Sequence, residues 1–166
     1  MGITKDIIQF ILDEIFTGKN ITLLGAALAV LLPGFGSAKA VNMVARATAG
    51  LISEEPGKYG KSMLLQALPM TQGIYGMVIS FLIMVFSGVM GGGEEISVAQ
   101  GVYYLFASFP IAFGGWYSAL KQGEVAAAGI SVLAKKPEAV GKAVISASFV
   151  ELYAILALLI SILLVL

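Results

Sequence analysis

The 166-residue sequence contains no cysteine and no histidine. The absence of cysteine excludes disulfides and thiol chemistry, and the absence of both residue types removes the usual zinc ligands. A bound metal ion would therefore have to be held by oxygen atoms. Charge is scarce as well, because only 12% of the residues are charged and the ten basic side chains balance the ten acidic ones. This balance gives no indication of nucleic-acid binding.

Long apolar runs dominate the sequence, which is 58% hydrophobic and has a mean hydropathy of +0.94. A helix needs about 20 apolar residues to cross a hydrocarbon core of roughly 30 Å. The runs are continuous, whereas the strands of a β-barrel alternate. We therefore predict an all-α membrane protein with four transmembrane helices. The uncharged runs are 20–38, 62–93, 96–120 and 143–166, the last interrupted only by Glu151.

The N-terminal segment does not have the basic-then-apolar order of a cleaved signal peptide, because it carries Asp6, Asp13 and Glu14. Isoleucines recur in it at helical spacing. We expect residues 1–19 to form an amphipathic helix that lies in the membrane interface. The isoleucines are Ile3, Ile7, Ile8, Ile11 and Ile15.

The lysines predict how the helices are oriented in a cell membrane. Loops 53–61 and 134–142 are rich in lysine, and basic loops tend to remain in the cytoplasm. The central loop holds Glu94 and Glu95 and has no basic residue, so we place it outside. Both chain termini are then outside as well.

One sequence pattern occurs twice, at an offset of 81 positions. We divide the chain into two helical hairpins, 20–93 and 94–166, which have the same in-out sense and form a parallel duplication. Glu151 aligns with Met70, so only the second hairpin carries a carboxylate at this position. Matched pairs include Ser37 with Ser118, Pro56 with Pro137, Lys61 with Lys142 and Ser80 with Ser161.

Small residues are concentrated in the first and third spans, whereas the second and fourth spans carry bulky aliphatic side chains. Small residues four positions apart give a helix a flat face that a neighbouring helix can approach closely. Such faces suit a ring with the small-residue helices inward, and they suit tight packing within a monomer equally well. The rows include Gly34 with Ala38, Gly36 with Ala40, and Gly115, Ala119, Gly123 and Ala127.

Glu151 requires an explanation, because a charge at the bilayer centre costs on the order of 3 kcal/mol. At about 1.5 Å per helical residue from the lysines of the cytoplasmic loops, Glu151 lies roughly 13 Å deep, Gln72 roughly 16 Å and Gln122 roughly 20 Å. A protonated glutamate that serves only helix packing would not be expected to coincide in depth with two amides. We therefore predict a polar site near the midplane.

The second span supplies further candidate ligand oxygens near the depth of Glu151. Leu68, Thr71, Gln72 and Tyr75 share one helix face, and Pro69 is expected to bend the helix beside them. A carboxylate, amides, a hydroxyl and a backbone carbonyl suit a monovalent hard cation, and they favour Na⁺ over H⁺ without excluding H⁺. The Tyr75 hydroxyl is placed to donate a hydrogen bond to the carboxylate and to orient it.

Four motifs resemble the rotor-ring proteolipid, the c or K subunit, of vacuolar-type ATPases. They are LPMTQGIYG at 68–76, KQGEVAAAGI at 121–130, LAKKPE at 133–138 and VELYAIL at 150–156. The sequence is most similar to Na⁺-transporting bacterial members. The resemblance implies that Na⁺ is bound by the Leu68 carbonyl, Thr71, Gln72, Gln122 and Glu151, and that Tyr75 bonds the carboxylate.

The resemblance also implies a mechanism and partners. Identical subunits would form a ring in the lipid bilayer and turn against a stator subunit of the a or I type, whose arginine displaces the cation from Glu151. A central-stalk subunit of the d or C type would dock on the cytoplasmic loops. The sequence has no phosphate-binding loop, so we expect a non-catalytic ion carrier. Alternatives are a small proton-coupled multidrug exporter and a purely structural channel proteolipid.

Overall fold

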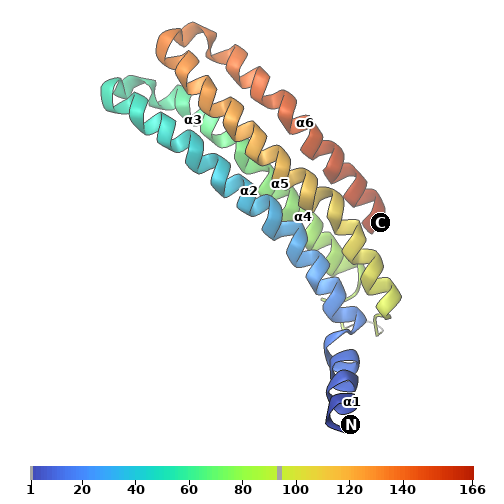
Figure 1. Ribbon diagram of the computed structural model, residues 1–166. Coiled ribbons are helices and arrows are strands. Elements are labelled where there is room, and N and C mark those ends of the chain that lie inside the picture. Colours follow the sequence, from blue (N-terminus) through green and yellow to red (C-terminus); the bar gives the residue numbers. More distant parts are fainter. Residues whose placement is uncertain (1, 93–94) are drawn as a thin grey trace.

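The computed structural model describes residues 2–92 and 95–166, which are almost entirely helical, and the all-α prediction is confirmed (Figure 1). A short π-helix, η1, follows the first helix, and 3₁₀ turns η2, η3 and η4 separate later ones. The elements are α1 (Gly2–Phe10), η1 (Ile11–Ile15), α2 (Gly18–Glu54), η2 (Pro56–Lys58), α3 (Tyr59–Ala67), η3 (Leu68–Met70), α4 (Thr71–Phe86), α5 (Val98–Lys135), η4 (Pro137–Ala139) and α6 (Val140–Val165).

The 81-residue offset of the sequence recurs in the backbone. Helix α2 ends at Glu54 and α5 at Lys135, and each is followed by a 3₁₀ turn that begins with a proline, Pro56 or Pro137. Proline fixes its own φ and has no N–H, so it suits the first position of a new helical turn. The same local chemistry therefore reverses the chain twice. The predicted boundary between the hairpins, at 93/94, lies outside the described residues, as does Glu94 of the central loop.

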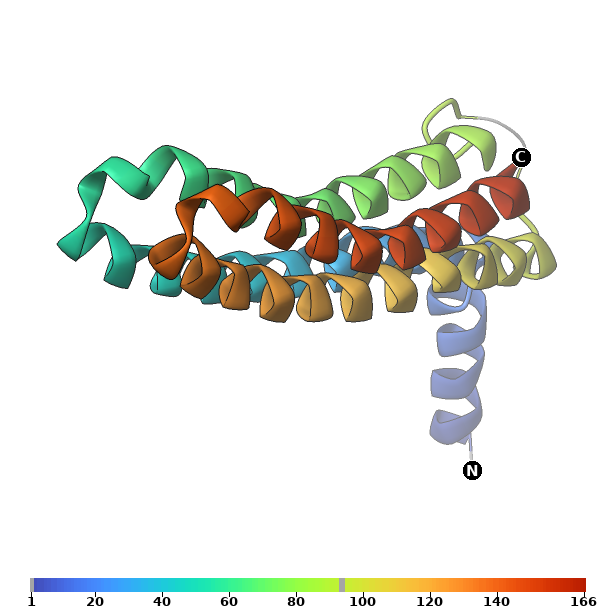
Figure 2. The same ribbon diagram turned by 90° about the horizontal axis from the view of Figure 1, so that it is seen from above.

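The helices form two layers. Figure 2 shows α2 and α5 side by side in one layer, with the α3–α4 segment and α6 in the other. Both proline turns lie at the same end of the bundle, and the C-terminus lies at the opposite end (Figure 1). This arrangement follows from a parallel duplication, because two hairpins with the same sense bring their turns together.

Three helical segments in the described part of the chain are long and apolar enough to cross a membrane: Gly18–Glu54, Pro56–Phe86 and Pro137–Val165. The predicted span 96–120 lies in α5, which is not among them. Helix α5 is long, but it carries many glycine, serine and tyrosine residues of low hydropathy. Its crossing of the membrane stays a prediction that rests on the uncharged run 96–120.

The second span is shorter than its uncharged run. The uncharged run covers 62–93, but α4 ends at Phe86. Gly88 adopts φ +77°, a left-handed conformation that ends helices and that favours glycine. At the other end of this segment, η3 interrupts the helix at Pro69, where the sequence predicted a bend.

The N-terminal segment is helical, as predicted, and it projects beyond the end of the bundle (Figure 1). Ile7, Ile8 and Ile15 are each about half exposed. The helix stops before Thr17, whose side chain accepts a hydrogen bond from the backbone N–H of Asn20 and caps α2. An amphipathic helix with exposed isoleucines suits a membrane interface, and that location stays a prediction.

Glycines let α2 and α5 approach backbone to backbone. A Cβ atom added at Gly36 would lie 2.7 Å from the carbonyl oxygen of Trp116, and one added at Gly123 would lie 2.6 Å from the Cβ of Ala40. Two of the small-residue rows therefore pack against each other within one chain. Gly34 has open space where its Cβ would be, and Ala38 in the same row is exposed, so this row has no partner within the described chain.

We expect Gly123→Ala to destabilise the bundle by about 1–3 kcal/mol, because a methyl group cannot enter this contact unless the helices separate. Thermal unfolding of the detergent-solubilised protein, followed by circular dichroism, measures the effect. Gly50→Ala is the matched control, since a Cβ at Gly50 meets nothing within 4 Å. Equal melting temperatures for the two variants would contradict the close α2–α5 contact.

Candidate ion-binding site

The three polar side chains predicted to share a depth meet in the structure. Gln72 on α4 donates from Nε2 to Oε1 of Gln122 on α5, at 2.6 Å. Gln122 in turn donates from its Nε2 to Oε2 of Glu151 on α6, at a long 3.4 Å. Both glutamines are completely buried, whereas Glu151 is half-buried. Two helices of the second hairpin and one of the first therefore contribute to a single polar cluster.

Tyr75 completes the contacts of the carboxylate. Its hydroxyl donates to Oε1 of Glu151 at 2.7 Å, so the two carboxylate oxygens have different partners. Gln72 and Tyr75 lie three residues apart on α4, nearly one helical turn, which places both side chains toward α6 and α5. A hydrogen bond to an ionised group is among the stronger ones in proteins, so the Tyr75 hydroxyl orients the carboxylate.

Thr71 and the Leu68 carbonyl lie together at the 3₁₀ turn. The Thr71 hydroxyl donates to the carbonyl oxygen of Leu68 at 3.1 Å, and the backbone N–H of Thr71 bonds the same oxygen. Because Pro69 has no N–H, the regular helical hydrogen-bond pattern is broken at this turn. The hydroxyl oxygen of Thr71 keeps its lone pairs available, since it acts as donor in this contact.

One buried acceptor of the cluster has no partner. Oε1 of Gln72 makes no hydrogen bond within the described residues, although it is shielded from solvent. A buried acceptor without a partner costs about 1–3 kcal/mol. A cation beside this oxygen would satisfy it. No group of three or more acidic side chains occurs within the described residues, so the donor set here is one carboxylate with neutral oxygens.

Backbone contacts that sequence reasoning missed hold the cluster in place. The Ala147 carbonyl accepts from Nε2 of Gln122 at 3.2 Å, and the Ser118 hydroxyl donates to the Val150 carbonyl at 2.9 Å. Both contacts join α5 to the turn of α6 that immediately precedes Glu151. Every residue has a backbone carbonyl, so the sequence does not indicate which carbonyls accept these bonds. Only Ser118, which repeats Ser37 at the 81-residue offset, could have indicated one of the two contacts.

Two charged residues of α5 do not belong to the polar cluster. Lys121 and Glu124 pair with each other at 2.9 Å, and both side chains are about half exposed. Met70, which aligns with Glu151, is 50% exposed on the opposite side of the first hairpin. The two hairpins therefore have similar backbones, but the first has a thioether and the second a carboxylate at this position.

Comparison with known proteins defines the class. The family model for the C subunit of ATP synthase matches the chain twice, at residues 24–83 and 105–164, which are again 81 positions apart. The V-type sodium ATPase subunit K of Enterococcus hirae is 50% identical over 149 residues, which cover 90% of this chain and 92% of that protein. The A-type ATP synthase subunit K of Methanocaldococcus jannaschii is 36% identical over 142 residues, covering 85% of this chain and 60% of that protein.

A repeated helical pattern beside a half-buried carboxylate, together with these similarities, identifies a membrane proteolipid of the rotary ATPases. The chain belongs to the family of the ATP synthase C subunit, among the c and K proteolipids of V- and A-type ATPases. The resemblance drawn from the four motifs is thereby confirmed. Members of this group translocate ions and do not catalyse ATP hydrolysis themselves, in agreement with the expectation of a non-catalytic role.

Tyr75→Phe is expected to speed the reaction of Glu151 with a hydrophobic carbodiimide by about tenfold at fixed pH without Na⁺. The Tyr75 hydroxyl donates to Oε1 of Glu151, so its removal frees this oxygen for the reagent. Mass spectrometry of the labelled chain gives the rate. Tyr103→Phe, on the exposed surface of α5, is the control. An unchanged rate in Tyr75→Phe would show that the hydroxyl does not act on the carboxylate.

Proposed function

We propose that the chain is the ion-carrying rotor subunit of a V-type ATPase and that it transports Na⁺. One Na⁺ would bind to the Glu151 carboxylate, the side-chain oxygens of Gln122, Gln72 and Thr71, and the Leu68 carbonyl. The observation that carries this proposal is the unpartnered Oε1 of Gln72, buried within the cluster that contains Glu151. A coordinated cation would satisfy that oxygen.

The oxygen ligands of the site and the similarity to a sodium ATPase subunit both favour Na⁺. Hard monovalent cations accept neutral amide, hydroxyl and carbonyl oxygens around a single negative charge. The relative from Enterococcus hirae, which is 50% identical, is a sodium ATPase subunit. A purely protonic site needs only the carboxylate and one acceptor. The two buried glutamines, which are costly in a membrane, would then have no function.

Neutralisation of Glu151 explains how the site could move through lipid. An ionised carboxylate in hydrocarbon is costly, and a bound Na⁺ removes most of that cost. We propose that identical subunits form a ring and that an arginine of the stator subunit displaces Na⁺ from each Glu151 in turn. Tyr75 would hold the carboxylate in position while the cation leaves.

We further propose the orientation and the remaining contacts of this protein. Four spans, with α5 included, would cross the cell membrane, and the lysine-rich loops 53–61 and 134–142 would lie in the cytoplasm. The central-stalk subunit would dock there. The contacts of Lys58 with the Ala134 carbonyl and of Lys61 with the Pro137 carbonyl support this proposal, because they join the two loops into one surface. Family membership favours this rotor role over an exporter or a structural channel.

Na⁺ is expected to slow carbodiimide labelling of Glu151 at least tenfold at neutral pH, whereas KCl at equal ionic strength should not. The cation competes with the proton for the same oxygens, so the protection should weaken as the pH falls. Labelling that follows protonation but ignores Na⁺ at every pH would contradict the Na⁺ site and favour a H⁺-translocating rotor. Glu151→Gln serves as the unlabelled reference.

Gln72→Met is expected to raise the Na⁺ concentration needed for half-protection of Glu151 at least tenfold, which corresponds to about 1.4 kcal/mol. Methionine keeps the size of the side chain and removes the unpartnered oxygen. Labelling in the absence of Na⁺ should continue, which separates lost ion binding from unfolding. Gln66→Met makes the same chemical change on α3 and should leave protection unchanged. Equal half-protection in both variants would exclude Gln72 as a ligand.

A further inference from the structure

Two buried serines occupy equivalent positions in the two hairpins, Ser37 on α2 and Ser118 on α5. Each hydroxyl bonds the backbone of the neighbouring helix in its own hairpin. Ser37 accepts from the N–H of Gly73 at 3.0 Å, and Ser118 donates to the Val150 carbonyl at 2.9 Å. Such a bond fixes the rotation of the partner helix, because a backbone group cannot turn to another rotamer as a side chain can.

The two bonds meet their partner helices at the same repeated place. In an α-helix the carbonyl of one residue faces the N–H four residues later, so positions 69 and 73 form one such pair. The 81-residue offset converts this pair into positions 150 and 154. Ser37 bonds the N–H end of the first pair, and Ser118 bonds the carbonyl end of the second. Both hairpins therefore use one place in the helix, with donor and acceptor exchanged.

Pro69 explains the exchange. The 3₁₀ turn that contains Pro69 delays the start of α4, so the Gly73 N–H is among the first N–H groups of its helix, which have no acceptor within it. Ser37 supplies the missing acceptor. Helix α6 is continuous at the equivalent place, and the Val150 carbonyl has a second lone pair that can accept from Ser118.

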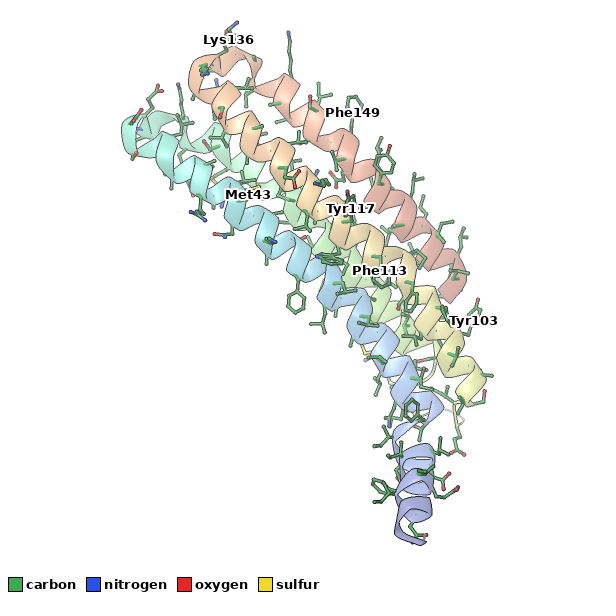
Figure 3. The ribbon with its side chains drawn as sticks, viewed as in Figure 1. Met43, Tyr103, Phe113, Tyr117, Lys136 and Phe149 are labelled. Carbon is green, nitrogen blue, oxygen red and sulfur yellow. The ribbon has the colours of Figure 1, made fainter. Side chains whose placement is uncertain are left out.

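Both bonds lie directly beside residues of the proposed ion site. Gln72 precedes Gly73, and Glu151 follows Val150. On the other side of Val150, Phe149 points away from the bundle (Figure 3) and is 63% exposed. At about 100° per residue, Glu151 lies roughly 160° around the helix from Phe149. A rotation of α6 that turned Phe149 inward would therefore turn the carboxylate away from the polar cluster.

Helix α5 determines the rotation of α6 through two side chains. Ser118 and Gln122 lie four residues apart and share one face of α5. Gln122 bonds the Ala147 carbonyl at 3.2 Å and Glu151 at 3.4 Å, whereas Ser118 makes the shortest of the three contacts, at 2.9 Å. The contact that holds the backbone beside the carboxylate most closely thus comes from a residue outside the ligand set.

We propose that Ser37 and Ser118 are positioning residues of the Na⁺ site. Ser37 holds the turn of α4 that carries Gln72, and Ser118 holds the turn of α6 that carries Glu151. Both serines raise the affinity for Na⁺ through these ligands and do not touch the ion. This inference rests on the proposed Na⁺ site and adds the residues that keep its ligands in register.

Ser118→Ala is expected to raise the Na⁺ concentration for half-protection of Glu151 from carbodiimide about fivefold, because α6 loses the bond beside the carboxylate. Ser118→Thr keeps a hydroxyl and should restore most of the affinity. Ser161→Ala is the matched control. Ser161 is buried and accepts from the Ile111 N–H at 3.1 Å, so this variant also loses an α5–α6 bond, but far along α6 from Glu151.

Ser161→Ala should lower the melting temperature, followed by circular dichroism, and leave half-protection unchanged. A role of Ser118 in stability alone predicts the same behaviour for Ser118→Ala. Equal half-protection in the two alanine variants would therefore overturn the positioning role of Ser118.

A double-mutant cycle tests Ser37, because this residue is proposed to act through Gln72. Ser37→Ala alone should raise the Na⁺ concentration for half-protection about threefold. In a chain that already carries Gln72→Met, the same substitution should add nothing, since methionine has no ligand oxygen to position. An equal fold-change in both backgrounds would overturn the role of Ser37.

Failure of the proposed function gives a different result. If Na⁺ does not protect Glu151 of the unsubstituted protein at any pH, Na⁺ transport is wrong, and the labelling rate without Na⁺ then tests Ser118. Ser118→Ala should raise that rate, because a less firmly held α6 frees the carboxylate from Tyr75, whereas Ser161→Ala should not. Equal rates in the two variants would overturn the positioning role as well.

Discussion

The close backbone contact between α2 and α5 is the constraint on which the remaining structure depends. Gly36 and Gly123 allow α2 and α5 to meet without intervening side chains, and a larger residue at either position would separate these helices. Such a separation would also displace α4 and α6. Ser37 of α2 accepts a hydrogen bond from the backbone N–H of Gly73 near the start of α4, and Ser118 of α5 donates to the Val150 carbonyl beside Glu151. The inner contact thus fixes the distance between Tyr75 and the carboxylate.

The polar cluster is stabilised only in part by its own contacts. Gln72 donates one hydrogen bond to Gln122, and the carboxylate of Glu151 receives one short and one long hydrogen bond. A buried network with an unused acceptor is costly in a soluble core and more so in a membrane. The proposed cation would complete this network by occupying the unused acceptor. The incompleteness is therefore itself an indication of function.

Much of this arrangement followed from the sequence, because membrane helices are long and regular and depth can be counted along them. Glu151, Gln72 and Gln122 were predicted to lie at one depth, and the structure brings them within hydrogen-bond distance. The end of α4 was missed, since hydropathy does not register the left-handed conformation of Gly88. The hydrogen bond from Gln122 to the Ala147 carbonyl could not be predicted either, because every residue has a backbone carbonyl whatever its type.

The small-residue rows show a different limit of the sequence. Rows at Gly34 and at Gly36 look alike, yet one packs within the chain and the other remains open. The choice depends on a rotation of α2 that composition does not specify.

Met70 has a mechanical consequence for a ring of such chains. Each polypeptide contributes two hairpins to the circumference but only one carboxylate, so a complete turn would move as many ions as there are chains, half the number of hairpins. The work delivered by one revolution would be divided among fewer ions, and each could be driven against a steeper gradient. In such a ring, a methionine in the first repeat would therefore lower the number of ions moved per turn and raise the force available for each.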